Sequence, residues 1–359
     1  MKVGIVGMPN AGKSTLFSAL TGVQAQAANY PFTTIEPNVA IVPVPDERLD
    51  AIAATIGSNP LVHETIEFHD IAGLVRGAHE GEGLGNRFLG NIRETDAIVH
   101  VVRAHADPNV VHPEGKIDPL SDIEAVETEL VFADLEQAER RLERVTKQAR
   151  SGDKAAIAEQ AWLGDVVAAL QEGRWARTVP PPPDAPEALR NLFPLTGKPV
   201  LYVVNVGEGD DEVPAAVAEH AAETDAVVVP ISARIEAELG ELPDDEAQAM
   251  REELGAGESS LGRVIHAAFE LLHLISFFTA GEAKEARAHA IPRGTTAWQA
   301  AGKVHSDIQK GFVRAEVVPW NVLVDAGGYA GARDKGLLRI EGRDYAMQDG
   351  DVITVRFTP

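Results

Sequence analysis

The sequence contains no cysteine, which excludes disulfide bonds, cysteine-ligated metal sites and thiol catalysis. It also lacks any apolar run close to the roughly 20 residues that a membrane-spanning helix needs. The first strand pattern begins at residue 2 and leaves no room for a cleaved signal peptide. We therefore expect a cytoplasmic protein and no membrane partner.

Basic residues are in deficit, because 32 Lys and Arg stand against 55 Asp and Glu and give a formal net charge of −23. This balance argues against a protein that coats nucleic acid by bulk attraction, and no DNA partner is expected. Residues 278–359 carry eleven basic and ten acidic side chains, so the first 277 residues hold all of the negative excess. Either the acidity serves solubility alone, or a polyanion binds the C-terminal segment or a local basic face.

Residues 7–14 read GMPNAGKS and match the phosphate-binding pattern G-x-x-x-x-G-K-S. A strand pattern precedes them and a helix pattern follows, which is the context of a nucleoside triphosphate site. Lys13 would reach the β- and γ-phosphate oxygens, and the Ser14 hydroxyl would bind Mg²⁺. Asn10 either supports a monovalent cation such as K⁺ or only forms the turn. The candidate phosphate-binding residues are Asn10, Ala11, Gly12, Lys13, Ser14 and Thr15.

Two further segments are predicted to meet the γ-phosphate. Asp70 closes the third major strand pattern, where its carboxylate can hold Mg²⁺, and the Gly73 N–H can meet the γ-phosphate. Thr34, which we prefer to Thr33, can ligate Mg²⁺ only when the γ-phosphate is present. The sequence therefore predicts a metal set of Ser14, Thr34 and Asp70.

The base pocket is predicted where two later strands end, at residues 205–208 and 231–233. Guanine recognition uses Asn-Lys-x-Asp, whose aspartate accepts hydrogen bonds from the base. Val206 and Glu208 stand in place of that lysine and aspartate, which removes the selection against adenine and favours ATP over GTP. The candidate base-binding residues are Asn205, Val206, Glu208, Ser232 and Ala233.

Leu74 occupies the position where a glutamine would orient the attacking water, so hydrolysis should be slow or depend on another group. His112, just after the fourth major strand pattern, is our catalytic candidate in addition to Lys13. His79 and His105 are rivals, and a surface histidine with no catalytic role is the alternative.

Strand patterns at residues 2–6, 39–44, 65–70, 97–103, 199–206 and 226–231 alternate with helical or glycine-rich segments. This order predicts an α/β domain with a mostly parallel sheet and helices on both faces. An apparent capping box at Ser121 and Glu124 opens a helix pattern that resumes over 155–171, which predicts an inserted antiparallel coiled-coil arm. Basic residues near its turn fit either solvated helix flanks or RNA contact.

Further strand patterns at residues 286–291, 312–318, 337–340 and 352–357 surround one predicted helix and indicate a small α+β domain. We expect a nucleotide-binding domain at 1–120 and 195–277, a helical arm at 121–194 and a C-terminal domain at 278–359.

Taken together, these motifs resemble the YchF family, the Obg-like ATPases of the translation-factor-related P-loop GTPase class. The similarity runs from end to end and rests on residues 4–15, 30–38, 70–93, 205–208, 277–281, 311–316 and 348–353. It implies a G domain, an inserted arm and a β-grasp TGS domain. It also implies ATP preference, Mg²⁺ dependence, and association with the ribosome, particularly its large subunit.

The resemblance further implies a role in translation or stress responses, with the arm or the TGS domain as the candidate rRNA contact. His112 matches the proposed catalytic histidine of that family, and Leu74 matches its hydrophobic substitution. Ala11 differs from the more common valine, and Val206 differs from the residue usual there. Two alternatives stay open: a GTP-using switch, and a nucleotide-gated ribosome-binding module whose hydrolysis is incidental.

Overall fold

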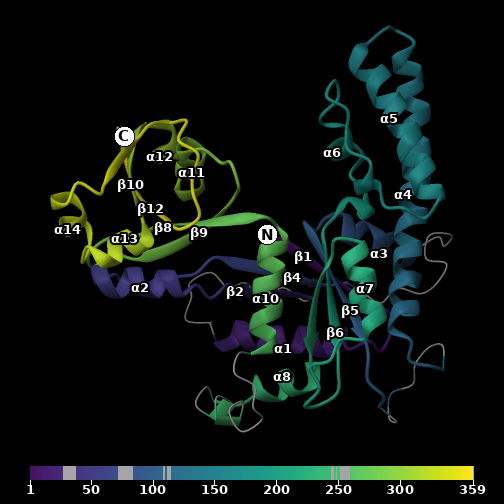
Figure 1. The fold of residues 1–359 in the computed structure, drawn as a ribbon, viewed down its shortest axis with the longest axis horizontal. Coiled ribbons are helices and arrows are strands. Elements are labelled where there is room, and N and C mark those ends of the chain that lie inside the picture. Colours follow the sequence, from purple (N-terminus) through teal and green to yellow (C-terminus); the bar gives the residue numbers. More distant parts are fainter. Residues whose placement is uncertain are drawn as a thin grey trace. The chain divides into compact units, whose positions relative to one another are not determined.

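The computed structural model describes residues 1–26, 38–71, 84–107, 110, 115–243, 246–247, 249–250 and 259–358 (Figure 1). The chain forms two compact units. The first contains Met1–Gln26, Thr34–Ile41 and Glu67–Leu271, and the second contains Ala27–Thr33, Val42–Ile66 and Leu272–Pro359. Among the described residues, no helix combines the length and apolar character that crossing a membrane requires.

The first unit is built on a six-stranded sheet with the order β2-β4-β1-β5-β6-β7. Strands β4, β1, β5, β6 and β7 pair in parallel, so that Val3 lies opposite both Phe68 and Ala97. The mostly parallel sheet expected from the sequence is thereby confirmed. The strands are β1 (Lys2–Val6), β2 (Val39–Pro43), β4 (Thr65–Asp70), β5 (Ala97–Arg103), β6 (Val200–Asn205) and β7 (Val227–Ile231).

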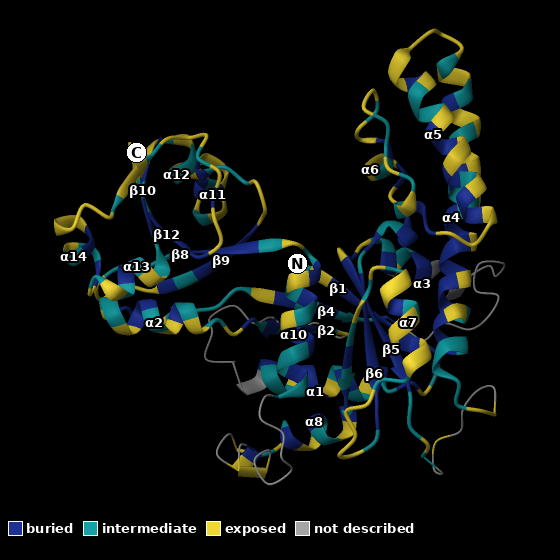
Figure 2. Cartoon of the chain, viewed as in Figure 1, coloured by how far each residue is buried: buried dark blue, intermediate teal, exposed yellow. Residues whose placement is uncertain are grey.

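Helices cover both faces of this sheet, whose strands are largely buried (Figure 2). Side chains of α3, α4 and α7 form one core cluster with Val6, Ile98 and Tyr202 from the strands. Helix α10 packs against β5, β6 and β7 with a separate set of buried side chains. Apart from those of the arm, the helices named in this unit are α1 (Lys13–Gln26), α3 (Leu84–Arg93), α7 (Ala215–Glu223), α8 (Ala233–Leu239) and α10 (Ser260–Leu271).

The inserted arm consists of α4 (Pro119–Ala149) and α5 (Lys154–Gln171), which lie side by side (Figure 1). Arg141 of α4 donates to Glu159 of α5 at 2.6 Å. The capping box expected at Ser121 is wrong: the Asp118 carboxylate caps α4 and accepts from the Ser121 N–H at 3.2 Å. Proline at the first helical position explains this earlier start. The chain returns through η1 (Ala176–Thr178), α6 (Ala188–Leu192) and η2 (Leu195–Gly197).

The second unit is a six-stranded sheet with the order β11-β10-β12-β8-β9-β3. Its strands are β3 (Leu61–Val62), β8 (Leu274–Thr279), β9 (Ala286–Pro292), β10 (Phe312–Pro319), β11 (Arg339–Glu341) and β12 (Asp351–Phe357). Its helices are α2 (Glu47–Ile56), α11 (Ala297–Val304), α12 (Ser306–Lys310), α13 (Trp320–Asp325) and α14 (Tyr329–Asp334). Side chains of α11 share one core cluster with Phe277 and Val317.

Residues 42–66 cluster with the second unit, although the sequence grouped them with the nucleotide-binding domain. Helix α2 buries Leu49 and Ile52 in a core cluster that also contains Phe278. Arg48 donates to Asp349 at 2.7 Å. The apolar face of α2 therefore belongs to the core of the second unit.

Candidate nucleotide-binding site

The phosphate-binding loop joins β1 to α1 and passes very close to two neighbouring strands. Gly7 has a φ of +148° and Gly12 a φ of +107°. A Cβ at Gly7 would lie 2.3 Å from the Val101 carbonyl oxygen, and one at Gly12 would lie 2.3 Å from Asn205 Nδ2. Only glycine allows this path, so these two residues of the motif are explained by backbone geometry.

Lys13, the first residue of α1, is 8% exposed, and its Nζ donates to the Met8 carbonyl oxygen at 2.8 Å. Burial lowers the pKa of Lys13, and the nearby Asp70 carboxylate opposes that effect. Burial likewise raises the pKa of Asp70, with Lys13 opposing it. Lys13 and Asp70 thus share one electrostatic environment. An anionic phosphate would stabilise the charged form of Lys13, and a bound cation would stabilise that of Asp70.

Asn205, at the end of β6, connects three of the predicted segments. Its Nδ2 donates to the Ala11 carbonyl oxygen at 3.1 Å, and its Oδ1 accepts from the Ala233 N–H at 3.2 Å. Asn205 is 7% exposed, so both contacts are shielded from water. One amide side chain therefore fixes the phosphate-binding loop to the turn between β7 and α8.

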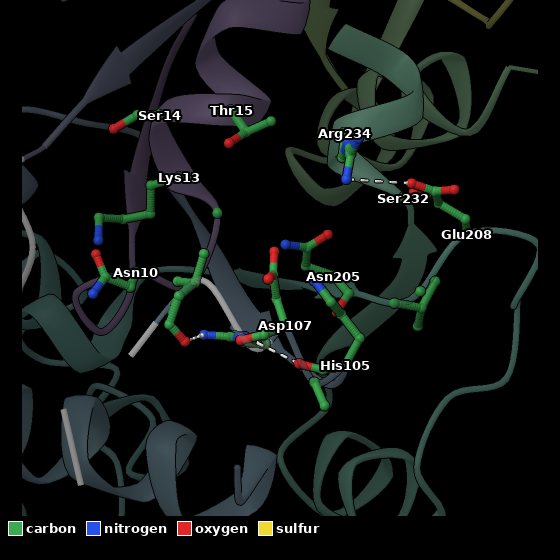
Figure 3. Close-up of a pocket in the computed structure, with 16 residues that line it drawn as sticks. Asn10, Lys13, Ser14, Thr15, His105, Asp107, Asn205, Glu208, Ser232 and Arg234 are labelled. Carbon is green, nitrogen blue, oxygen red and sulfur yellow. Dashed lines mark hydrogen bonds and ion pairs between the residues drawn. The ribbon is translucent and has the colours of Figure 1, made fainter. Parts of the chain in front are cut away.

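These segments surround a cavity of about 660 Å³ (Figure 3). It is lined by Asn10, Gly12, Lys13, Ser14, Thr15, Arg103, His105, Ala106, Asp107, Val110, Asn205, Val206, Gly207, Glu208, Ser232 and Arg234. Most of the predicted phosphate- and base-binding residues thus meet in one place. Ala11 and Ala233 do not line the cavity, but their main-chain atoms form hydrogen bonds with Asn205, which does. Asp70 does not line the cavity either.

At the rim, the Glu208 carboxylate lies 3.6 Å from Arg234 (Figure 3). Arg234 also contacts Glu238 at 2.9 Å. Both Glu208 and Arg234 are largely exposed. Glu208 is therefore engaged by a cation of the protein itself.

The segment that follows β5 supplies another wall, which sequence reasoning largely missed. His105, a rival catalytic candidate, lines the cavity, and its Nδ1 lies 3.0 Å from the Asn205 carbonyl oxygen. Arg103, Asp107 and Val110 also line it. Their position after a central strand was the available signal, because parallel strands present their carboxyl ends to the same edge.

Several predicted residues lie outside the described part of the chain: Thr34, Gly73, Leu74, His79 and His112. Within the described residues, no group of three His, Cys, Asp or Glu side chains could hold a metal ion. Ser14 and Asp70, the predicted metal ligands that lie within the described residues, would supply only oxygen atoms. That donor set suits Mg²⁺, which usually completes its shell with phosphate oxygens and water.

A buried polar cluster lies in the core of the first unit, on β5, β6, α4 and α7. Tyr202 donates to Glu127, which also contacts His220 at 3.0 Å. The His100 ring lies 5.6 Å from that of Tyr202. Complete burial, together with Lys13 and His220, lowers the pKa of His100 to about 3, so His100 is neutral in the folded protein.

Comparison with known proteins identifies the family. Residues 2–138 match the MMR_HSR1 model, described as a 50S ribosome-binding GTPase, and residues 274–358 match the YchF-GTPase_C model, described as a protein of unknown function. The ribosome-binding ATPase YchF of Bacillus subtilis is 46% identical over 363 residues, which span 99% of each chain. The chain belongs to the YchF family.

A second YchF relative, from Escherichia coli O157:H7, is also named a ribosome-binding ATPase and is 48% identical over 359 residues, 99% of each chain. The solved YchF GTPase of Schizosaccharomyces pombe is 36% identical, with a TM-score of 0.89 over 99% of this chain and 97% of that one. The similarity to YchF proteins therefore covers both units, including the YchF-type C-terminal domain. P-loop proteins of this class generally use a divalent metal.

Proposed function

We propose that this protein is a ribosome-associated ATPase that binds and slowly hydrolyses Mg²⁺-bound ATP and acts in translation or its stress regulation in the cytoplasm. The observation that carries the proposal is the single cavity shared by the phosphate-binding loop, Asn205 and the turn after β7. The names of the bacterial relatives support both the ATPase activity and the ribosome partner.

The loop binds the triphosphate through backbone N–H groups and the N-terminus of α1. Lys13 leaves the Met8 carbonyl oxygen and stabilises the charge that develops on the β- and γ-oxygens. Because Lys13 is almost fully buried, its attraction for phosphate is screened less than that of a surface lysine.

Mg²⁺ would be held by Ser14 and Asp70 and, when the γ-phosphate is present, by Thr34, and it would neutralise charge on the phosphate oxygens. Gly73 donates its N–H to the same phosphate. Asn10, whose φ is +64°, lies beside Lys13 at the cavity, where a K⁺ ion would add to the neutralising charge.

Adenine occupies the pocket bounded by Val206, Glu208 and Ser232. The ion pair between Glu208 and Arg234 supports this assignment, because a carboxylate engaged by arginine is a poor substitute for the aspartate that selects guanine. Direct competition of ATP and GTP for the purified protein tests it, and tighter binding of GTP would favour the switch GTPase instead.

His112 is the proposed catalytic residue, and Leu74 makes the reaction slow. Replacement of His112 by alanine should lower kcat while leaving ATP affinity nearly unchanged, because the imidazole acts on the water and not on the bound nucleotide. His105→Ala is the matched comparison, since that ring lines the cavity. Normal turnover in His112→Ala would remove this histidine from the mechanism.

The ribosome partner is the large subunit, and the arm or a C-terminal TGS domain contacts rRNA. Six basic residues lie near the turn of the arm: Arg140, Arg141, Arg144, Lys147, Arg150 and Lys154. ATP turnover measured with and without ribosomes tests the proposal. Stimulation supports a switch ATPase, whereas unchanged turnover at every salt concentration supports a binding module with incidental hydrolysis, which Leu74 also favours.

A further inference from the structure

One wall of the nucleotide cavity is held by a buried arginine. Arg103 is the last residue of β5 and is 2% exposed. Its Nε donates to the His105 carbonyl oxygen at 3.0 Å, and its Nη1 donates to that of Val110 at 3.1 Å. Its Nη2 donates to that of Asp107 at 3.3 Å. All three nitrogens of one guanidinium group thus bind the loop that follows the strand.

These acceptors are main-chain oxygens, so the guanidinium fixes the path of the backbone whatever side chains the loop carries. His105, Asp107 and Val110 all line the cavity. The guanidinium is planar and its donors diverge in a fixed fork, which suits three separated carbonyl oxygens better than a single ammonium does. Arg103 therefore determines where this wall stands.

The wall is continuous with the end of β6, where the base pocket is proposed. The Asn205 carbonyl oxygen accepts from the Ala104 N–H at 2.9 Å and lies 3.0 Å from His105 Nδ1. Figure 3 places His105 and Asp107 on a different side of the cavity from Ser14 and Thr15. The wall thus contacts the end of β6 directly, next to the residues proposed to bind the nucleoside.

We propose that Arg103 is a positioning residue for the nucleoside: it holds the backbone at His105, Asp107 and Val110 so that base and ribose bind, while the phosphate-binding loop holds the triphosphate independently. This inference rests on the proposed function, because it requires a nucleoside triphosphate in the cavity. Because Arg103 is assigned to the nucleoside half of the site and not to the phosphate half, its role can be tested with one ligand that occupies both halves and one that occupies the phosphate half alone.

The test is calorimetry on the full-length protein with Mg²⁺-bound ATP and with Mg²⁺-bound inorganic tripolyphosphate, which has no nucleoside. Arg103→Met and Arg103→Lys should each weaken ATP binding by about tenfold or more, as expected when hydrogen bonds from a charged donor are lost. Tripolyphosphate binding should change by less than about twofold, which is within the error expected for a site that keeps all its contacts. The lysine variant keeps the buried charge, so the test remains usable if Arg103→Met does not fold.

Arg177→Lys is the matched control. Arg177 also donates to a main-chain oxygen, that of Lys198 at 3.0 Å, and its guanidinium lies 4.2 Å from the Trp175 ring, but it does not line the cavity. Its substitution should leave both affinities unchanged.

Unchanged ATP affinity in the Arg103 variants would overturn the inference. An equal loss of affinity for ATP and for tripolyphosphate would also overturn it, because Arg103 would then support the phosphate site or the fold as a whole. Failure of both Arg103 variants to fold would overturn it for the same reason. If the unsubstituted protein bound tripolyphosphate but not ATP, the proposed function itself would fail, and this inference with it.

Discussion

Replacing Asn205 by aspartate tests how the phosphate-binding loop is held. The substitution keeps the shape of the side chain and the oxygen that accepts from the Ala233 N–H, but it removes the Nδ2 donor to the Ala11 carbonyl oxygen. A carboxylate oxygen would then face that carbonyl oxygen across a contact that is now 3.1 Å. The change therefore removes one hydrogen bond and adds one negative charge in a site that is only 7% exposed.

A buried carbonyl left without its donor costs about 1–3 kcal/mol, and the added negative charge also repels the triphosphate. Since about 1.4 kcal/mol corresponds to a factor of ten, ATP affinity should fall by roughly 10- to 100-fold. Calorimetry with Mg²⁺-bound ATP measures the affinity, and thermal unfolding without ligand measures the stability lost.

Asn191→Asp controls for the change in the protein's net charge, because Asn191 is exposed on α6 and does not line the cavity. It should bind ATP normally. If Asn205→Asp matched the unsubstituted protein in both affinity and melting temperature, the hydrogen bond to Ala11 would not hold the loop.

Two further predictions concern backbone geometry and pH. Gly12→Ala should abolish ATP binding, because the φ of Gly12 is +107° and a Cβ there would lie 2.3 Å from Asn205 Nδ2. Gly57 has a φ of +74° but open space around it, so Gly57→Ala should cost only about 1 kcal/mol of stability. Equal ATP affinity in the two variants, measured by calorimetry, would contradict this prediction. Because the folded pKa of His100 is about 3 and the unfolded value is about 6.5, the unfolded state binds more protons between these pH values, and His100 should lower the unfolding free energy by about 1.4 kcal/mol between pH 7.5 and 5.5. Urea denaturation of the protein and of His100→Phe checks this, and an identical pH dependence in both would refute it.

The parallel sheet and the phosphate-binding loop were predictable because their signals are local. Each buried strand is a short run of β-branched residues, and the loop motif requires glycine where the backbone touches its neighbours, as Gly12 does. The assignment of α2 to the second unit was not predictable. Its apolar residues Leu49 and Ile52 indicate a buried face, but nothing local shows which sheet covers that face.

The candidate site shows the same division. Lys13, Ser14 and Asn205 follow from motifs, and the structure places them around one cavity. Arg103 could not be found in this way, because an arginine at a strand end is usually exposed and its partners are main-chain oxygens, which leave no pattern in the side chains. The contact between Glu208 and Arg234 likewise depends on the parallel pairing of β6 and β7, which brings the carboxyl ends of these strands to the same edge of the sheet.

The central claim is that Mg²⁺-bound ATP occupies the cavity around Lys13, and the most direct test is calorimetric titration of the full-length protein and of Lys13→Ala. We expect saturable heat with ATP, weaker heat with GTP, dependence on Mg²⁺, and no binding to Lys13→Ala. Absence of heat with either nucleotide in the unsubstituted protein, or undiminished binding to Lys13→Ala, would contradict the claim.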